Sequence, residues 1–323
     1  MKALVTGATG FVGSHVVAAL QARGDTVVAL CRRPAARGAL EALGAFPVPG
    51  SLEDEPALRA ALAGVDVVYH VAGLVTGTPQ ALTQVNETGT RRLLGCCRDL
   101  AVPRFVLVSS QAALGPSPPG VRLTEDAPCR PLTPYGRSKL AGELVVRAET
   151  RVAWTIVRPP SVYGPRDREF LRLFQIVRRG FAPVFGWGTQ ELSLVHATDL
   201  AEAIARAGRM DRAAGQVYHA AHREIITAAN LARAAGAAVG RRPVVVPVPG
   251  LLAAPIVWAI DQASRRAGTT TVVTTDKLAE FLAPAWLLDS GKAERELGWT
   301  AALDAAAGMR AVAVWYREQG WLP

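Results

Sequence analysis

Two side chains near the middle of the chain have the types and the spacing for acid–base chemistry. Tyr135 and Lys139 lie four residues apart in the segment PYGRSK, so they share one face if that segment is helical. A free phenol has a pKa of about 10. A neighbouring ammonium group favours the phenolate and would move the pKa of Tyr135 toward neutrality, where proton transfer is efficient. An exposed pair on any helix would look the same, so the surrounding elements must decide.

Three more polar residues precede this pair and could belong to the same site. Ser109 and Ser110 follow the apolar run at 106–108, and the carboxyl ends of buried parallel strands are where open α/β sheets bind ligands. Ser110 could therefore hold a carbonyl oxygen beside Tyr135, or both serines could simply end the strand. Asn86 starts a helical pattern after a loop at 76–84, and it could serve the site or only cap the helix.

A glycine-rich turn lies near the start of the chain, in the segment VTGATGFVG. Gly7, Gly10 and Gly13 follow an apolar run at 2–6 and open an amphipathic pattern at 10–23. Glycine lets the backbone approach a pyrophosphate closely, and the free N–H groups at the start of a helix bind the anion. The alternative is a tight turn without a ligand. In this context the turn predicts a dinucleotide site.

The residues after the second apolar run indicate which dinucleotide binds. An NAD site usually has an acidic residue about 20 residues past the glycines, where it meets the ribose 2′-hydroxyl. This chain has Arg32 and Arg33 there and no acid. Two guanidinium groups suit a 2′-phosphate through forked, charge-assisted hydrogen bonds. We therefore expect NADP in preference to NAD; the alternative is that both arginines are solvated loop residues.

Short apolar runs alternate with helical patterns through the first half of the chain. We expect strands at 2–6, 26–30, 65–70, 105–109 and 153–157, and helices at 10–23, 57–63, 86–100 and 135–150. Nearly all strand residues are apolar, as in parallel sheets covered on both faces. The pattern predicts an α/β fold, with a Rossmann-type doubly wound parallel sheet over 1–165 that segment 192–221 rejoins. Residues 166–191 and 222–323 should form a smaller C-terminal lobe that binds substrate at the carboxyl edge of the sheet.

The composition argues against several other classes of protein. The net charge is +9, but the basic residues are spread out and do not alternate with aromatic residues, so we expect no nucleic-acid partner. The four cysteines, Cys31, Cys96, Cys97 and Cys129, lack metal-ligand spacing, and we expect no metal site. The chain runs directly into a strand without a signal peptide, so we expect a cytoplasmic protein.

One apolar stretch stands out in the second half, LLAAPIVWAI at 251–260. It is too short to cross a bilayer, contains a proline, and is followed by Asp261 and by Arg265 and Arg266. We expect a helix of the core or of a pocket wall, with no stable membrane span. Docking at a membrane surface is the alternative.

Together these motifs resemble those of the extended short-chain dehydrogenase/reductase family, the NAD-dependent epimerase/dehydratase superfamily. The matching segments, in order, are TGATGFVG at 6–13, HVAG at 70–73, VNETGT at 85–90, VSS at 108–110, PYGRSK at 134–139, RPPSVYGP at 158–165 and VHATDL at 195–200. The resemblance implies Tyr135 as the catalytic acid/base, Lys139 as its partner, Ser110 as the hydroxyl of a triad and Asn86 as a supporting residue.

The resemblance also implies which residues contact the cofactor. The expected contacts are Gly7, Thr9, Gly10, Phe11, Val12, Gly13, Arg32, Arg33, Ser51, Leu52, Val71, Ala72, Gly73, Tyr135, Lys139 and Pro159. One of these positions departs from the family pattern. Many members have Gly-Asp-Leu after the third strand, where the Asp meets the adenine, and this chain has Gly-Ser-Leu at 50–52.

A second departure concerns the substrate. The sugar-nucleotide branch tends to carry G-x-G-x-Q-x-R-D, whose Arg meets the substrate diphosphate, and this chain has GWGTQELS at 186–193. A leucine cannot pair with a phosphate, and burying a phosphate without cations is costly. The alternative is that Arg166, Arg168 or Arg172 takes the place of that arginine. The chain is therefore more similar to the branch of 3β-hydroxysteroid dehydrogenases and dihydroflavonol reductases. An apolar set either fits such a substrate or is plain core: Leu251, Leu252, Ile256, Trp258, Phe281 and Trp286.

We therefore expect an NAD(P)-dependent oxidoreductase that transfers hydride between the nicotinamide and a ketone or secondary alcohol on a relatively apolar small molecule. The alternative is a nucleotide-sugar epimerase or dehydratase with tightly bound NAD. A third hypothesis is a nucleotide-binding sensor without activity, since a fold does not fix a function. The resemblance further implies a homodimer formed through the helices at 86–100 and 135–150.

Overall fold

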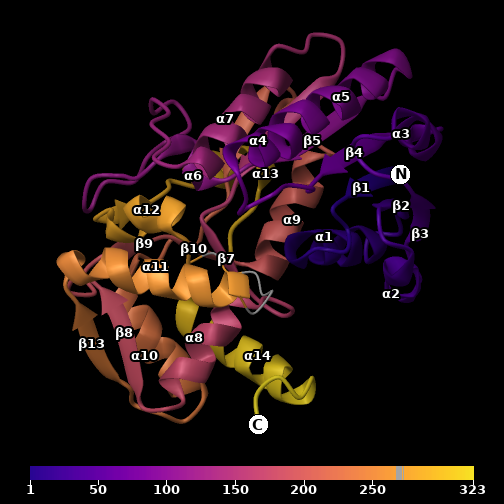
Figure 1. Cartoon of the computed structure of the whole chain (residues 1–323). Helices are drawn as coiled ribbons and strands as arrows, with labels where there is room; N and C mark the ends of the chain where they lie inside the picture. The colour runs from indigo at the N-terminus through magenta and orange to yellow at the C-terminus, as the bar shows by residue number, and fades with distance from the viewer. Residues whose placement is uncertain (267–270, 272) are drawn as a thin grey trace.

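A seven-stranded parallel sheet forms the centre of the protein (Figure 1). The computed structural model describes residues 1–266, 271 and 273–323. In spatial order the strands are β11 (Gln216–His219), β6 (Ala153–Arg158), β5 (Arg104–Val108), β4 (Val67–His70), β1 (Lys2–Thr6), β2 (Thr26–Cys31) and β3 (Phe46–Pro49). All neighbours are parallel, so the carboxyl ends share one edge. The strand order reverses between β1 and β4, the kind of position where such sheets bind ligands.

Helices cover both faces of this sheet (Figure 1). On one face, α1 (Phe11–Gln21) and α9 (Ala197–Ala207) pack together and contribute Val16, Leu20, Leu200 and Ile204 to a buried apolar cluster. On the other face, α3 (Glu55–Leu62), α5 (Thr90–Asp99) and α7 (Pro134–Arg147) contribute to a second cluster. Because both faces are buried, the strands between them are almost entirely apolar.

A smaller lobe lies at the lower left of Figure 1 and has a core of its own. Its helices are α8 (Glu169–Val177), α10 (Ala228–Ala238), α11 (Gly250–Arg266), α12 (Leu278–Leu282) and α14 (Ala305–Glu318). Its strands are β8 (Phe181–Phe185) with β13 (Val244–Val248), and β12 (Ile226–Thr227), β9 (Glu191–Leu192) and β14 (Ala285–Trp286) in a second small sheet. The two remaining strands, β7 (Ser161–Tyr163) and β10 (Leu194–His196), pair with each other.

The predicted fold class is confirmed, and the predicted strands and helices of the first half lie within a few residues of the observed ones. The strand that escaped prediction is β3, with the sequence FPVP. Its two prolines remove ladder donors, which a strand tolerates at the edge of a sheet, and β3 is the edge strand.

Two local predictions before α5 are wrong. The expected loop at 76–84 contains the short helix α4 (Pro79–Thr83), which Thr78 caps by accepting a hydrogen bond from the Ala81 N–H at 3.2 Å. Asn86 is not an N-cap, because it lies inside a π-helical turn, Gln84–Gly89, that joins α4 to α5. The residue that caps the start of the helical segment is therefore Thr78, eight residues before Asn86.

Of the two structural alternatives predicted for the apolar stretch at 251–260, the core helix is wrong. The stretch is helical, as the first part of α11, but only Ala253 and Val257 are buried and the other residues are exposed. It is therefore not a core helix. Among the residues described by the structure, no helix has the length and apolar character needed to cross a bilayer.

Candidate active site

A cavity of about 580 Å³ lies at the carboxyl ends of β4, β5 and β6. Gly73 follows β4, Ser110 follows β5 and Pro159 follows β6, and all three line it. Tyr135 and Lys139 reach it from α7. The structure therefore gathers, around one hollow, side chains that lie far apart in the sequence and that the motifs had singled out.

Tyr135 lies in the first turn of α7. Thr133 caps this helix by accepting a hydrogen bond from the Gly136 N–H at 3.1 Å, and Pro134 occupies the first helical position. Burial raises the pKa of Tyr135 to about 12, although a hydrogen bond with the Ser110 side chain acts in the opposite direction. The phenol is therefore protonated at neutral pH and bonded to the hydroxyl at the end of β5.

Lys139 is buried one helical turn further on, and its Nζ donates to the Val108 carbonyl oxygen at 2.7 Å. Burial lowers the pKa of Lys139 to about 8, while the Glu143 carboxylate opposes this shift. The predicted displacement of the Tyr135 pKa toward neutrality is wrong for this structure, because burial raises that pKa and the charge of Glu280 acts in the same direction. A protonated phenol is the form that can give a proton to a carbonyl oxygen.

Asn86 lies behind the cavity and connects two of its walls. Its side-chain amide donates to the Leu74 carbonyl at 2.8 Å and to Ser138 Oγ at 2.9 Å, and its Oδ1 accepts from the Leu74 N–H at 2.8 Å. Ser138 Oγ in turn donates to the Tyr135 carbonyl at 2.8 Å. Asn86 thus holds the segment after β4 against the first turn of α7, and the π-helical turn gives it this position.

His70 links the glycine-rich turn to the same network. The Thr90 hydroxyl donates to the Asn86 carbonyl at 2.8 Å, so it accepts from His70 Nε2 at 2.9 Å. His70 Nδ1 must then accept from the Thr6 hydroxyl at 2.7 Å, and Thr6 accepts from the Ala72 N–H at 3.2 Å. Burial, followed by the charge of Lys139, lowers the pKa of His70 to about 3, which fits this neutral tautomer.

A buried ion pair joins the C-terminal half of α7 to the end of β6. Glu143 accepts from Arg158 Nε at 2.8 Å and from its Nη2 at 2.6 Å, and both side chains are fully buried. The Ser109 hydroxyl donates to the same carboxylate at 2.5 Å. Both serines line the cavity, but Ser109 has a structural role in joining β5 to α7, and Ser110 is the serine whose side chain is hydrogen-bonded to Tyr135.

Gln111 also lines the cavity, and the motifs gave no reason to select it. Its side chain is 3% exposed, and its Nε2 has no hydrogen-bond partner among the described residues. A buried amide donor without a partner carries a desolvation cost. Its position next to Ser110 makes it a donor available to a ligand in the cavity.

A second cation lies at the phenol, from a part of the chain that sequence reasoning did not connect with Tyr135. The Nζ of Lys277, just before α12, lies 4.5 Å from the centroid of the Tyr135 ring. Nearby, Glu280 Oε1 accepts from the Thr133 hydroxyl at 2.5 Å. The C-terminal lobe therefore closes over the first turn of α7 and completes the wall of the cavity.

Space at the glycine-rich turn explains two of its glycines. A Cβ on Gly7, whose φ is +72°, would lie 2.6 Å from the Ala72 nitrogen, and a Cβ on Gly13 would lie 2.1 Å from the Gly7 carbonyl oxygen. Gly10 precedes α1 and has no side chain to cap its first-turn N–H groups. Phe11 and Val12, the first residues of α1, line the cavity that contains Lys139. The residues therefore fit a dinucleotide whose pyrophosphate binds at α1.

The remaining predicted cofactor residues follow β2 and β3 along the same edge of the sheet. Arg32 and Arg33 are exposed after β2, and neither is in an ion pair among the described residues. Ser51 and Leu52 are half-buried after β3. Of the sixteen predicted contacts, those that line the cavity itself are Phe11, Val12, Val71, Gly73, Tyr135, Lys139 and Pro159. The others lie nearer to β1, β2 and β3.

The predicted apolar set divides into two groups. Phe281 and Trp286 line the cavity, together with Phe170 and Leu192. Leu251, Leu252, Ile256 and Trp258 are exposed on α11 and do not line it, so their predicted part in a pocket or core is wrong. The reason is that α11 buries only a narrow stripe of its surface.

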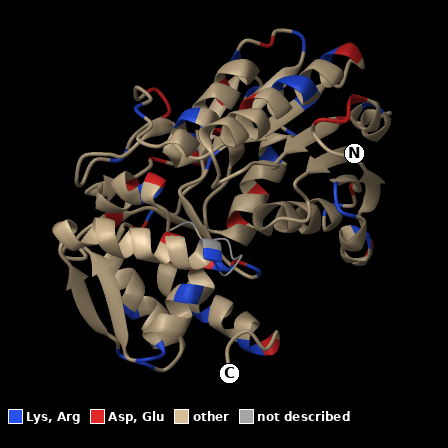
Figure 2. Ribbon diagram, viewed as in Figure 1, with Lys and Arg blue, Asp and Glu red and all other residues tan. Residues whose placement is uncertain are grey.

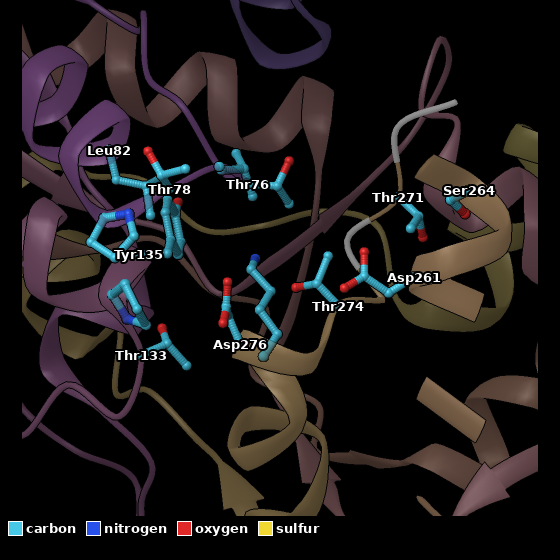
Figure 3. Close-up of a pocket in the computed structure, with 15 residues that line it drawn as sticks. Thr76, Thr78, Leu82, Thr133, Tyr135, Asp261, Ser264, Thr271, Thr274 and Asp276 are labelled. Carbon is cyan, nitrogen blue, oxygen red and sulfur yellow. The ribbon is translucent and has the colours of Figure 1, made fainter. Parts of the chain in front are cut away.

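A second cavity of about 420 Å³ adjoins the first and shares Val75, Tyr135 and Lys277 with it (Figure 3). Figure 3 shows Thr76, Thr78 and Leu82 around one end and Asp261 and Ser264 of α11 at the other. The Tyr135 ring thus lies where the two hollows meet. No group of three or more metal-ligating side chains occurs among the described residues.

Comparison with known proteins agrees with this geometry. The model of the NAD dependent epimerase/dehydratase family matches residues 3–221. The ceramide reductase of Caulobacter vibrioides is 33% identical over 99% of this chain and 95% of its own length. The 4-hydroxy-2-methyl-3-oxo-4-farnesyl-3,4-dihydroquinoline-1-oxide ketoreductase of Stigmatella aurantiaca is 33% identical over 68% of this chain and 67% of its own.

A solved structure gives the same result for the fold. The dTDP-glucose 4,6-dehydratase DesIV of Streptomyces venezuelae, with NAD bound, has a TM-score of 0.79 at 27% identity over 99% of this chain and 98% of that chain. Fold and relatives define an NAD(P)-dependent enzyme of the short-chain dehydrogenase/reductase type. Within that class, the chain belongs to the NAD-dependent epimerase/dehydratase family.

Proposed function

We propose that this enzyme reduces a ketone on an apolar small molecule with NADPH. The observation that carries the proposal is a protonated phenol in a cavity whose lining is mainly apolar. Phe281 and Trp286 contribute to that lining, beside the polar Gln190 and the charged Lys277 and Glu280. The names of the relatives point in the same direction, since they act on a ceramide and on a farnesylated quinoline.

The residues of the cavity divide the work of reduction. When bound, the nicotinamide supplies a hydride to the carbonyl carbon. Ser110 holds the carbonyl oxygen, Tyr135 gives that oxygen a proton, and a secondary alcohol results. Lys139 stabilises the phenolate that Tyr135 becomes, and Gln111 donates a hydrogen bond to a polar group of the substrate. Donors placed in advance around the developing alkoxide contribute most of the acceleration.

Replacement of the phenol tests the proposal. Tyr135→Phe removes the proton donor and keeps the ring, so we expect turnover of a long-chain ketone with NADPH to fall by at least about a hundredfold. The affinity for NADPH, measured by fluorescence titration, should change little. Val314→Ala, at an exposed position of α14 that does not line the cavity, is the control and should keep full activity. Full turnover by Tyr135→Phe would overturn the proposal.

A nucleotide-sugar epimerase is the competing function, and cofactor behaviour separates the two. An epimerase returns its hydride to the substrate, so it would convert a nucleotide sugar without consuming NADPH. The proposed reductase consumes one NADPH for each alcohol formed. Leu192, which stands where the sugar-nucleotide branch has an arginine, lines the cavity and offers a phosphate no charge.

Three finer features belong to the same proposal. The exposed Arg32 and Arg33 favour NADPH over NADH, so Arg32→Ala should weaken NADPH binding about tenfold or more and leave NADH binding unchanged. A homodimer through α5 and α7 is supported by Leu144, which is 58% exposed on α7. A cytoplasmic location is supported by the four cysteines, which are all free.

A further inference from the structure

Helix α11 exposes the side that a globular helix normally buries. Its buried positions, Ala253, Val257 and Asp261, recur every four residues and form one narrow stripe. The other eight residues of the stretch 251–260 are exposed, and every one of them is apolar. Leu251 is 93% exposed and Trp258 is 58% exposed. A contiguous apolar face of this kind marks an interaction surface.

The exposed apolar surface continues beyond the helix. Trp187, in the turn after β8, is 78% exposed, and its neighbour Gly186 donates to the Val248 carbonyl at 2.8 Å. That bond places Trp187 beside the end of β13, two residues before α11 begins. Phe181, Val244 and Val246 on the paired strands β8 and β13 are exposed as well. We call these residues together with 251–260 the α11 face.

Exposed arginines lie at both ends of the α11 face, whereas Asp261, which follows the stretch 251–260, is buried. The segment 250–260 contains no charged residue, and Figure 2 shows the first part of α11 without blue or red. Arg178 and Arg179 precede β8, and Arg241 and Arg242 precede β13. The bond from the Val244 N–H to the Gly180 carbonyl at 2.9 Å places all four at one end of this strand pair. Arg266 ends α11 on the other side.

The α11 face and its arginines fit the surface of an anionic bilayer better than they fit a second copy of the chain. An apolar face with exposed tryptophans, bounded by arginines, matches the boundary between acyl chains and anionic head groups of a bilayer. The clusters of arginines would repel each other if two copies met face to face. The net charge of +9 favours an anionic surface in the same way.

The inner side of α11 faces the active site. Asp261 and Ser264 line the second cavity, which reaches Tyr135 and Lys277 (Figure 3). The helix therefore separates the α11 face from the hollow that joins the catalytic cavity.

We propose that the α11 face docks on the surface of an anionic phospholipid bilayer. The docking is peripheral, because the apolar part of α11 is only about 15 Å long at the rise of an α-helix. It goes beyond the proposed function and does not depend on it, since binding to lipid is measured without turnover.

Vesicle flotation tests this proposal directly. The full chain is mixed with vesicles of phosphatidylcholine containing phosphatidylglycerol, and with vesicles of phosphatidylcholine alone. We expect the protein to float with the anionic vesicles and at least tenfold less with the neutral ones. The double variant Leu251→Glu/Trp258→Glu should lose flotation at least tenfold. Both side chains are mostly exposed, so the fold should remain.

The matched control is Phe46→Glu, which adds a charge at a residue of β3 that is 62% exposed, outside both the α11 face and the proposed dimer helices. It should float like the unmodified chain. Circular dichroism and turnover of a short, water-soluble ketone should be the same for the double variant and the unmodified chain. Failure of the unmodified chain to float, or equal flotation of the double variant, would overturn the proposal. So would sedimentation showing, without lipid, that the double variant changes a dimer into a monomer.

Discussion

At the scale of single residues, burial decides the chemistry of this site. The structure leaves the Tyr135 phenol protonated and the Lys139 ammonium close to its titration point, because burial disfavours the charged form of both groups. The two pKa shifts have opposite effects on the activity expected of a reductase. The raised pKa of Tyr135 keeps the phenol protonated, as the reaction requires. The lowered pKa of Lys139 means that its positive charge is lost in mildly alkaline solution.

The pKa of Lys139 gives a prediction for the pH profile. The ammonium form exists below about pH 8 and is lost as the pH rises through that value. We expect kcat/KM for ketone reduction to fall about tenfold per pH unit above pH 8, because kcat/KM reports ionisations of the free enzyme. Lys139→Arg, whose charge persists, should flatten that limb in any activity it retains. A level profile to about pH 9.5 in the unmodified enzyme would contradict this role for Lys139.

Gln111 gives a prediction that separates function from stability. Gln111→Leu removes a buried donor that has no partner among the described residues. We expect the free energy of unfolding in urea to stay the same or rise by about 1 kcal/mol, because the desolvation cost disappears. In contrast, kcat/KM should fall about tenfold or more, since the substrate loses a hydrogen bond.

A loss of stability together with activity would show that the Gln111 amide serves the fold. Gln111→Asn is the conservative variant and should recover part of the activity by keeping a donor.

Gln111 also shows what could not be predicted from the sequence. Tyr135, Lys139 and Ser110 could be found because a fixed spacing connects them to the glycine-rich turn. Nothing in the sequence shows that a glutamine amide is buried without a partner, because that depends on all its neighbours.

At the scale of elements, the site depends on how closely α7 approaches the π-helical turn. Gly142 of α7 lies against the turn, and a Cβ there would be 2.4 Å from the Asn86 carbonyl oxygen. This close approach allows the Asn86–Ser138 hydrogen bond that holds the first turn of α7. The helix pair could be predicted from its periodicity. The π-helical turn could not, because a run such as QVNETG has no periodicity of its own.

Two glycine substitutions test this packing. Gly142→Ala should lower the free energy of unfolding by about 1–3 kcal/mol and reduce activity, because the backbone of α7 must move away from Asn86. Gly95→Ala is the control, since Gly95 lies inside α5 with no atom within 4 Å of the methyl group that alanine would add. There alanine should be neutral or stabilise by about 0.5–1 kcal/mol. Equal effects of the two changes in urea unfolding would contradict the account.

At the scale of the whole molecule, the sheet and its cofactor edge follow from the sequence more completely than the lobe does. Strands buried on both faces give uninterrupted apolar runs, and their alternation with helices after a glycine-rich turn predicts a doubly wound parallel sheet. The division into 1–165 with 192–221, and the rest as a substrate lobe, remains a prediction. In the lobe, Leu251 and Val257 look alike in the sequence, yet one is exposed and the other is buried.

The central claim is that hydride passes from the nicotinamide to the carbonyl carbon of an apolar ketone while Tyr135 supplies the proton. The most direct measurement uses NADPH carrying deuterium at the transferred position, with a long-chain methyl ketone as substrate, and mass spectrometry of the product. We expect one deuterium on the carbinol carbon with the unmodified enzyme and almost no product with Tyr135→Phe. An alcohol without deuterium, or equal labelled product from both enzymes, would contradict the account.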